Sequence, residues 1–360
     1  MRALERNILH HLPTIVWGPP GVGKTAVINA IAKKHKRFIG TFILSHHEPP
    51  DIAGWPLMTD GKLRFVPPVL AEELVKSRNG ILFIDEFSTA NYALQAPTLR
   101  LIHERCWGDM QLPPTISIVL AGNPPDTSSG TYYLSAAAAN RPMHLTFALN
   151  PLDWCQHFPT YWGEEPEKPD LSMAGWRLWR ARIAGYIHSR PQALHVLPKS
   201  EAQRGGAWPS PRSWDLFSQA CADIPDPQAE IELVAEFGAG CIGEGVSQEF
   251  IIYLRDLDLP DPALLLKNPD KFRMPKRGDQ AYALLSAIVS HALHNLTPEI
   301  WMAAWQIMGA AYKEHAGDLV FSVASPLATI GQKKKDLPLP EKELKRFTPL
   351  LILISQQEQK

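Results

Sequence analysis

Hydrophobic and polar positions alternate in blocks along the first 150 residues, and these blocks predict alternating strands and helices. Five short runs rich in β-branched and aromatic residues predict strands. They cover 14–17, 38–44, 80–85, 116–121 and 143–149. Apolar residues at helical spacing predict helices over 24–35, 69–77, 91–104 and 134–140, whereas the proline-rich segment 45–68 is expected to be a loop. Apolar strands that alternate with helices predict an α/β fold, in which a parallel sheet carries helices on both sides.

After residue 150 the strand pattern ends and helical spacing continues. Helices are expected over 173–189, 212–223, 228–242, 245–255, 278–295 and 298–315. This pattern predicts five parts: an α/β domain over 1–150, a linker over 151–172, a small all-α lid over 173–260, a helical extension over 261–335 and a tail over 336–360.

Aromatic residues mark two places in this second half. Trp301, Trp305 and Met308 lie at helical spacing and are expected in the core. The segment 151–172 mixes aromatics with prolines and acids, which fits a linker pinned to the α/β core by Trp154, Phe158 and Trp162. A segment that docks a partner is the alternative.

Composition favours a globular protein with no strong attraction to polyanions. The chain has 360 residues, 45% hydrophobic and 20% charged, with a formal net charge of −1. That balance gives no overall basic field toward nucleic acid or a membrane. We expect no membrane span and no signal peptide, because neither a long apolar run nor an apolar leader is visible. The four cysteines form no CxxC pair, which fits reduced thiols in the cytoplasm.

The strongest chemical motif follows the first predicted strand. The run Gly18-Pro-Pro-Gly-Val-Gly-Lys24-Thr25 fits the phosphate-binding pattern G-x-x-x-x-G-K-[ST]. Glycines let backbone N–H groups turn toward phosphate oxygens, and the helix that follows adds its positive end. Lys24 is expected to reach the β- and γ-phosphates, and Thr25 to bind Mg²⁺. The expected nucleotide-binding residues are Gly18, Pro19, Pro20, Gly21, Val22, Gly23, Lys24, Thr25 and Ala26.

Two further motifs stand at the ends of later strands. The apolar run Ile81–Ile84 ends in Asp85-Glu86, where Asp85 is expected to hold the metal and Glu86 to polarise the attacking water. Asn123 follows the strand predicted at 116–121, so its amide is expected to sense the γ-phosphate or the water. Together these motifs predict an ATP hydrolase with ATP and Mg²⁺ as ligands.

This constellation resembles the AAA+ superfamily and, more narrowly, its MoxR group, which includes CbbQ- and NorQ-type ATPases. The resemblance covers about residues 10–260. Its more specific part is Glu48-Pro-Pro-Asp51-Ile-Ala-Gly54-Trp-Pro56, continued by Asp60-Gly61 and Phe65-Val-Pro-Pro68. In the MoxR group a similar segment is an insert that interrupts a helix and projects into the ring pore or onto a ring face. The resemblance therefore implies such an insert near 48–68.

The resemblance also implies roles for two arginines. Arg141 follows a short helix and stands where the family has the finger that reaches ATP in the neighbouring subunit. The surrounding residues depart from the family, which has an acidic residue and a phenylalanine where this chain has Asn140 and Pro142. Arg212 resembles the sensor arginine of the lid, which contacts ATP in its own subunit. The catalytic set thus comprises Lys24, Glu86, Asn123 and Arg141, and Arg212 joins the nucleotide-binding set.

The function implied is a chaperone-like ATPase that works as a ring, by family precedent a hexamer, and remodels, assembles or activates a client protein. A client with a von Willebrand factor A domain is what the family implies. One alternative is a nucleic-acid motor or defence-system ATPase, which the balanced charge and the two cations of the insert, Lys62 and Arg64, disfavour. Another is a nucleotide-gated scaffold without turnover, which would have no use for Glu86.

Overall fold

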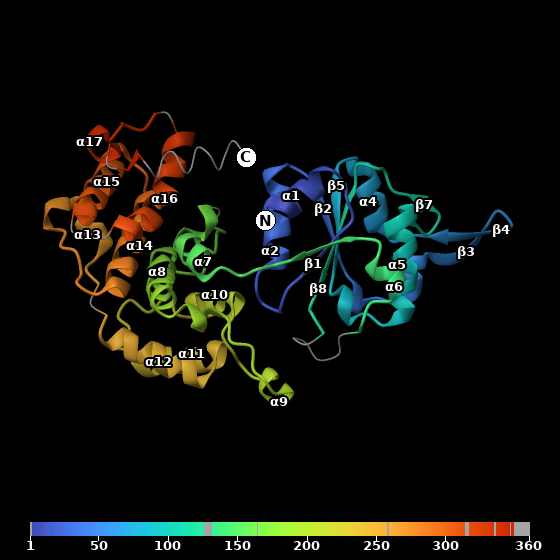
Figure 1. Ribbon diagram of the computed structural model, residues 1–360, viewed down its shortest axis with the longest axis horizontal. Helices are drawn as coiled ribbons and strands as arrows, with labels where there is room; N and C mark the ends of the chain where they lie inside the picture. Colours follow the sequence, from blue (N-terminus) through green and yellow to red (C-terminus); the bar gives the residue numbers. More distant parts are fainter. Residues whose placement is uncertain are drawn as a thin grey trace. The chain divides into compact units, whose positions relative to one another are not determined.

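A computed structural model describes residues 2–125, 132–163, 165–257, 259–313, 317–334, 336–345 and 347–348. The chain divides into two compact units, Met1–Leu149 and Asn150–Lys360. The first combines a sheet with helices, and the second is helical throughout its described part (Figure 1).

The first unit is built on a five-stranded parallel sheet in the order β2-β5-β8-β1-β9. All five strands predicted from the sequence are present, which confirms the α/β fold. Because the strands are parallel, their carboxyl ends meet at one edge of the sheet. The strands are β1 (Thr14–Trp17), β2 (Phe38–Ile43), β5 (Gly80–Asp85), β8 (Ser117–Gly122) and β9 (Met143–Thr146).

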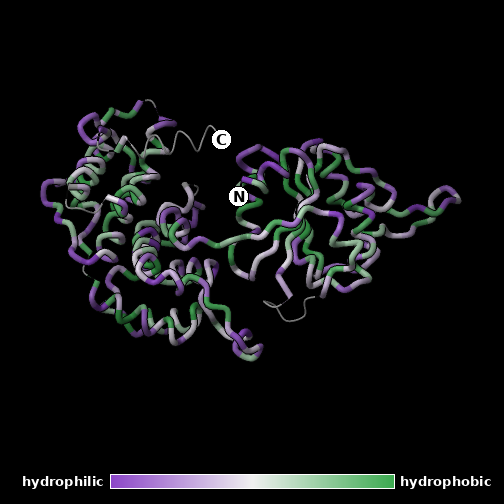
Figure 2. Tube along the Cα trace, viewed as in Figure 1, coloured by the Kyte–Doolittle hydropathy of each residue, from purple (hydrophilic) through white to green (hydrophobic). Residues whose placement is uncertain are grey.

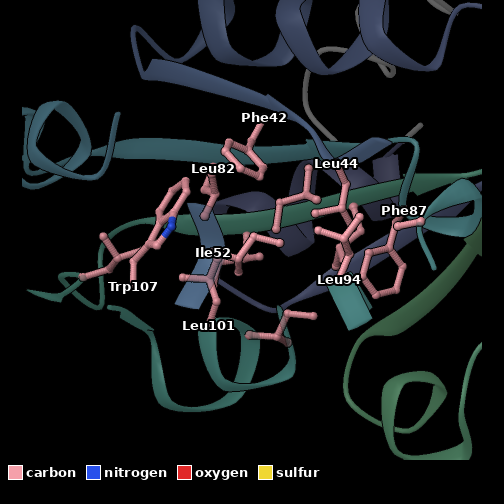
Figure 3. Close-up of a cluster of buried hydrophobic side chains, with 14 of the residues drawn as sticks. Phe42, Leu44, Ile52, Leu82, Phe87, Leu94, Leu101 and Trp107 are labelled. Atoms are coloured by element: carbon pink, nitrogen blue, oxygen red, sulfur yellow. The ribbon is translucent and has the colours of Figure 1, made fainter. Parts of the chain in front are cut away.

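Helices cover both faces of this sheet (Figure 1). Its central strands are hydrophobic along their length, as strands buried on both faces are (Figure 2). On β5, Ile81 and Phe83 face α1 (Arg2–Leu9) and α2 (Lys24–Lys34). Leu82 and Ile84 face the other way, into a core shared with α3 (Pro49–Ala53), α4 (Val69–Ser77) and α5 (Tyr92–Glu104) (Figure 3). Strand β5 is therefore buried on both faces, and only its carboxyl end is available for chemistry.

The prediction that 45–68 is a loop was wrong. After the 3-10 turn η1 (Leu44–His46) and helix α3, strands β3 (Trp55–Thr59) and β4 (Lys62–Val66) form an antiparallel hairpin. It turns at Asp60-Gly61, both at positive φ, which is the Asp-Gly signature of a tight hairpin. The prolines that suggested a loop lie at the ends of elements or in an edge strand, where a missing N–H is tolerated. A second small hairpin, β6 (Cys106–Trp107) with β7 (Met110–Gln111), was also not predicted.

The second unit confirms the predicted helical character. Helices α8 and α14 pack closely, and a side chain at Gly185 would place its Cβ 2.7 Å from the Cβ of Ala283. The helices are α7 (Pro151–His157), α8 (Met173–Ser189), α9 (Glu201–Arg204), α10 (Pro211–Ala220), α11 (Ile231–Ile242), α12 (Glu244–Arg255), α13 (Pro262–Lys267), α14 (Gly278–His294), α15 (Pro298–Lys313), α16 (Gly317–Lys333) and α17 (Glu341–Leu344), with 3-10 turns η3 (Phe158–Gly163), η4 (Pro191–Leu194) and η5 (Pro269–Lys271). Of the tail expected over 336–360, residue 346 and residues 349–360 lie outside the described residues.

The start of the expected linker is helical and packs within the second unit. Trp154 of α7 and Phe158 of η3 are buried, and their rings stack at 4.0 Å between centroids. Helix α7 packs on α8 and α16 rather than serving as an extended connection. Trp162 is 51% exposed, and its ring contacts Phe158 and Tyr161 of the same segment. Attachment of this segment to the α/β core stays a prediction.

The four cysteines are free thiols, as expected. Burial raises the pKa of Cys155 and Cys221, which keeps these two thiols protonated. None of the helices in the described part of the chain combines the length and apolar character that a membrane crossing requires.

We expect Trp305→Ala to lower the free energy of unfolding of the second unit by about 3–5 kcal/mol, because it leaves a large cavity. Trp305 is 1% exposed, as the sequence predicted, and its ring contacts Trp301 and Phe347. Urea unfolding followed by circular dichroism measures the change. Met302→Ala on the same helix is the control, since Met302 is 37% exposed and its loss should cost well under half as much. Equal losses for both variants would contradict the packing described here.

Candidate functional site

The predicted phosphate loop connects β1 to α2 at the carboxyl edge of the sheet. Gly21 and Gly23 adopt φ of 77° and 100°, conformations that residues with a side chain rarely adopt. Gly23 is also the N-cap of α2 and gives that helix no side-chain cap. The first N–H groups of α2 are therefore uncapped by a side chain, as an anion-binding helix end requires.

Lys24 joins the phosphate loop to the end of β8. Its Nζ donates hydrogen bonds to the carbonyl oxygens of Gly18, at 2.7 Å, and Pro19, at 3.1 Å. It also donates to Oδ1 of Asn123, at 2.8 Å. The structure thus brings together a lysine and an amide that lie 99 residues apart in the sequence. Phosphate oxygens at the loop would meet both an ammonium donor and an amide.

Thr25 and Asp85 also meet across this edge. The Thr25 hydroxyl donates to Oδ2 of Asp85 at 2.9 Å, and Asp85 is the last residue of β5. A hydroxyl beside a carboxylate supplies the oxygen ligands that Mg²⁺ prefers. No group of three or more His, Cys, Asp or Glu side chains is placed to hold a metal ion within the described ranges. Thr25 and Asp85 would hold a Mg²⁺ ion together with the phosphates of a bound nucleotide.

Glu86 stands next to this pair in a strained backbone conformation. Its φ of 57° lies in the left-handed region, which costs a non-glycine residue about 1–3 kcal/mol and is often found at functional sites. Its N–H donates to Oδ1 of Asp85 at 2.8 Å, which holds the Asp85 carboxylate against the backbone of Glu86. The Glu86 carboxylate accepts a hydrogen bond from the hydroxyl of Ser45.

Ser45, in the 3-10 turn η1 that follows β2, was not predicted as a site residue. Strands β2 and β5 are paired, with Ile43 opposite Asp85, so the residues after both strands are neighbours. A polar residue two positions after β2 was the available signal, but its use needed the strand order. Ser88 was missed for the same reason: its hydroxyl accepts from the N–H of Asn123 at 2.9 Å and anchors the loop after β8.

The two predicted arginines lie in different units. Arg141 follows α6 (Ala136–Ala139), is exposed, and donates from Nη1 to the carbonyl of Ala137 at 2.6 Å. Arg212 is exposed near the start of α10 in the second unit, where Ser210 and Ser213 form a capping box. The catalytic role given to Arg141 and the nucleotide-binding role given to Arg212 stay predictions.

This arrangement defines the class of protein. A parallel sheet in the order β2-β5-β8-β1-β9, with a phosphate loop after β1, two carboxylates at the end of β5 and an amide after β8, is the AAA+ fold. Residues 13–141 match the family described as AAA domain, dynein-related subfamily. The chain therefore contains an AAA domain and is a nucleotide-binding ATPase. Proteins with this domain typically oligomerise.

Comparison with solved structures gives distant matches. A RuvB variant from Thermotoga maritima is 16% identical, with 84% of this chain and 85% of that chain covered and a TM-score of 0.37. NtrX from Brucella abortus in complex with ADP is 17% identical, with 91% of this chain and 67% of that chain covered and a TM-score of 0.37. A sequence comparison with curated proteins finds no match.

Proposed function

We propose that the protein is a MoxR-like ATPase that hydrolyses ATP in a homo-oligomeric ring and uses the cycle to remodel, assemble or activate a client protein. The observation that carries the client part of this proposal is the β3–β4 hairpin, which projects from the ATPase unit (Figure 1). All residues of both strands are exposed.

The phosphate loop, Lys24 and Ala26 at the start of α2 would bind the triphosphate of ATP. Thr25 and Asp85 would hold Mg²⁺, which supplies charge neutralisation at the phosphates when bound. Glu86 would accept a hydrogen bond from the attacking water and orient it toward the γ-phosphate. Ser45 would hold the Glu86 carboxylate, and Asn123 would register the γ-phosphate through its contact with Lys24. Arg212 would report the nucleotide to the lid.

The exposed hairpin carries apolar side chains where a monomeric protein would have polar ones. Opposite pairs in the antiparallel register, Met58 with Leu63 and Trp55 with Val66, place apolar groups on both of its faces. Its six exposed large apolar residues are Trp55, Leu57, Met58, Leu63, Phe65 and Val66. The two strands of the hairpin contain only two cationic residues, Lys62 and Arg64. This surface is therefore better suited to bind apolar segments of a protein than a nucleic acid.

The base of the hairpin is firmly held, so movement of the core would move the hairpin with it. Asp109, in the turn of the second hairpin, accepts from the Phe65 N–H at 3.0 Å and donates its own N–H to the Phe65 carbonyl at 2.8 Å. Gly54 and Gly108 pack against each other, and neither position has room for a side chain. A Cβ at Gly54 would lie 2.8 Å from Cα of Gly108, and a Cβ at Gly108 would lie 2.4 Å from the carbonyl oxygen of Phe65. Both have positive φ.

Asp51 adds a polar anchor at the same place. It accepts hydrogen bonds from the Glu48 N–H, Trp55 Nε1 and His47. Burial acts to raise the pKa of Asp51, but these hydrogen bonds outweigh it and hold the pKa below its usual range. Asp51 therefore remains a carboxylate that ties the first strand of the hairpin to α3.

We expect the double variant Leu57→Ser, Met58→Ser to hydrolyse ATP at the wild-type rate but to lose client capture. The Glu86→Gln protein, which we expect to hold ATP without turnover, serves as bait in a pull-down with ATP or with ADP. Clients should be retained with ATP, and adding the two serine substitutions should remove them. Val69→Ser is the matched control, because Val69 is 69% exposed but lies outside the hairpin. Retention by the double variant equal to that of the control would contradict the role of the hairpin.

A further inference from the structure

His144 connects the phosphate site to the helix that precedes Arg141. It lies in β9, which pairs with β1. Its Nδ1 is 2.9 Å from Nε1 of Trp17, and its Nε2 is 2.7 Å from the carbonyl oxygen of Ala139. The rings of Trp17 and His144 lie 5.9 Å apart between centroids.

The chemistry of the two partners fixes the state of the imidazole. The indole N–H can only donate, so Nδ1 of His144 must be an unprotonated acceptor. The carbonyl can only accept, so Nε2 must carry the proton. Both hydrogen bonds therefore form only with the neutral Nε2–H tautomer. Nδ1 then bonds to Trp17 of β1, and Nε2 bonds to Ala139 of the short helix before Arg141.

The two ends of this bridge lie at two parts of the proposed catalytic machinery. Trp17 directly precedes Gly18, and its ring fills the space beside Gly122, where a Cβ would lie 2.8 Å from Trp17 Cζ3. Gly122 in turn directly precedes Asn123. Trp17 therefore ends the strand that carries the phosphate loop, and its ring contacts the end of the strand that carries the amide.

At the other end, Ala139 is the last residue of α6 and lies two residues before Arg141. The Arg141 guanidinium donates to Ala137 of the same short helix. Because α6 has only four residues, few backbone hydrogen bonds of its own fix its carboxyl end. Two backbone hydrogen bonds hold this end within the helix, from the Ala139 N–H to Ser135 and from the Asn140 N–H to Ala136. The His144 hydrogen bond to the Ala139 carbonyl ties the same end to β9.

We propose that His144 is a positioning residue for Arg141, linking each subunit's own phosphate site to the arginine that it presents to the neighbouring subunit. This inference rests on the proposed function, in which Arg141 acts in trans. His144 does not touch nucleotide in this role. A shift of the strand ends on nucleotide binding would reach α6 through the indole, the imidazole and the Ala139 carbonyl.

Three substitutions separate the two hydrogen bonds. His144→Phe removes both and should lower kcat for ATP hydrolysis by up to about a hundredfold, the cost of misplacing a catalytic group by about 1 Å, with KM unchanged. His144→Gln keeps a donor where Nε2 stands and should retain most of the rate. His144→Asn keeps only an acceptor where Nδ1 stands and should behave like the phenylalanine variant. Equal rates for the Gln and Asn variants would overturn the assignment.

Mixed rings test whether the defect lies in the arginine that is presented. A His144→Phe subunit keeps its own Glu86, and a Glu86→Gln subunit keeps a well-placed Arg141. Mixing the two inactive proteins should therefore restore hydrolysis at the interfaces where the first receives the arginine of the second. Arg141→Ala mixed with Glu86→Gln is the reference pair. Recovery also shows that the phenylalanine variant is folded, since it must carry out the hydrolysis.

The outcomes separate the inference from the proposed function. Recovery in both mixtures supports the positioning role. Recovery in the reference pair alone shows that His144 acts on its own site, which overturns this inference and leaves the proposed ring ATPase intact. Recovery in neither mixture shows that Arg141 does not act in trans, which overturns both. Full activity of His144→Phe by itself overturns the positioning role.

Discussion

Replacing Glu86 with glutamine should lower kcat for ATP hydrolysis by about 10²–10⁴-fold, the usual contribution of a general base. Glutamine has the same shape and can still accept the Ser45 hydrogen bond through its amide oxygen. It lacks the negative charge that polarises the attacking water. Nucleotide affinity should not fall, because the phosphate loop, Lys24 and Thr25 are untouched.

The measurement is steady-state hydrolysis together with ATP binding at equilibrium. Glu104→Gln is the matched control: Glu104 is exposed on α5 in the same unit, pairs with Arg100, and its loss should leave kcat unchanged. A Glu86→Gln protein that keeps its rate would show that another group activates the water. A protein that loses ATP binding as well would place Glu86 in the binding of nucleotide rather than in turnover.

The sheet and the phosphate site could be predicted because their signals are local. Strands β5 and β8 are buried on both faces and therefore read as continuous apolar runs in the sequence. The loop from Gly18 to Lys24 has a fixed spacing that only a few structures use. Asp85, Glu86 and Asn123 could be placed together because parallel strands carry their carboxyl ends to one edge.

The hairpin was missed because its strands are not buried. A buried strand shows an apolar run or an alternation, whereas β3 and β4 expose every residue and contain a proline. Only the Asp60-Gly61 turn signalled the pairing. The MoxR resemblance implied an insert at this position, but the residues alone did not show its conformation.

Ser45, Ser88 and His144 were missed for a different reason. Each is an ordinary polar residue whose partner is set by which strands lie side by side. Ser45 meets Glu86 because β2 pairs with β5, and His144 meets Trp17 because β9 pairs with β1. The sequence contains the residues but not the strand order, so these contacts required the structure.

Arg141→Ala should lower kcat by about 10³-fold or more, the range in which arginine fingers act on phosphoryl transfer, while each subunit still binds ATP. The Arg141 side chain is exposed, as the side chain of a residue that reaches another subunit must be. Its guanidinium donates a hydrogen bond to the Ala137 carbonyl of α6. Arg141→Lys should recover little of the rate, because an ammonium keeps the charge but lacks the planar fork of donors. Arg6→Ala, an exposed arginine on α1, is the matched control and should be silent.

The dependence of the rate on protein concentration decides whether the arginine acts between subunits. If Arg141 completes a neighbour's site, the wild-type rate per subunit must rise with concentration as rings form, and light scattering must show the larger species over the same range. Arg141→Ala should form the same species in ATP yet stay slow at every concentration, because assembly then supplies no finger. A wild-type rate that is constant in a stable monomer would place the whole active site within one chain. The exposed position of Arg141 would then need another explanation, and ATP hydrolysis would not require a ring.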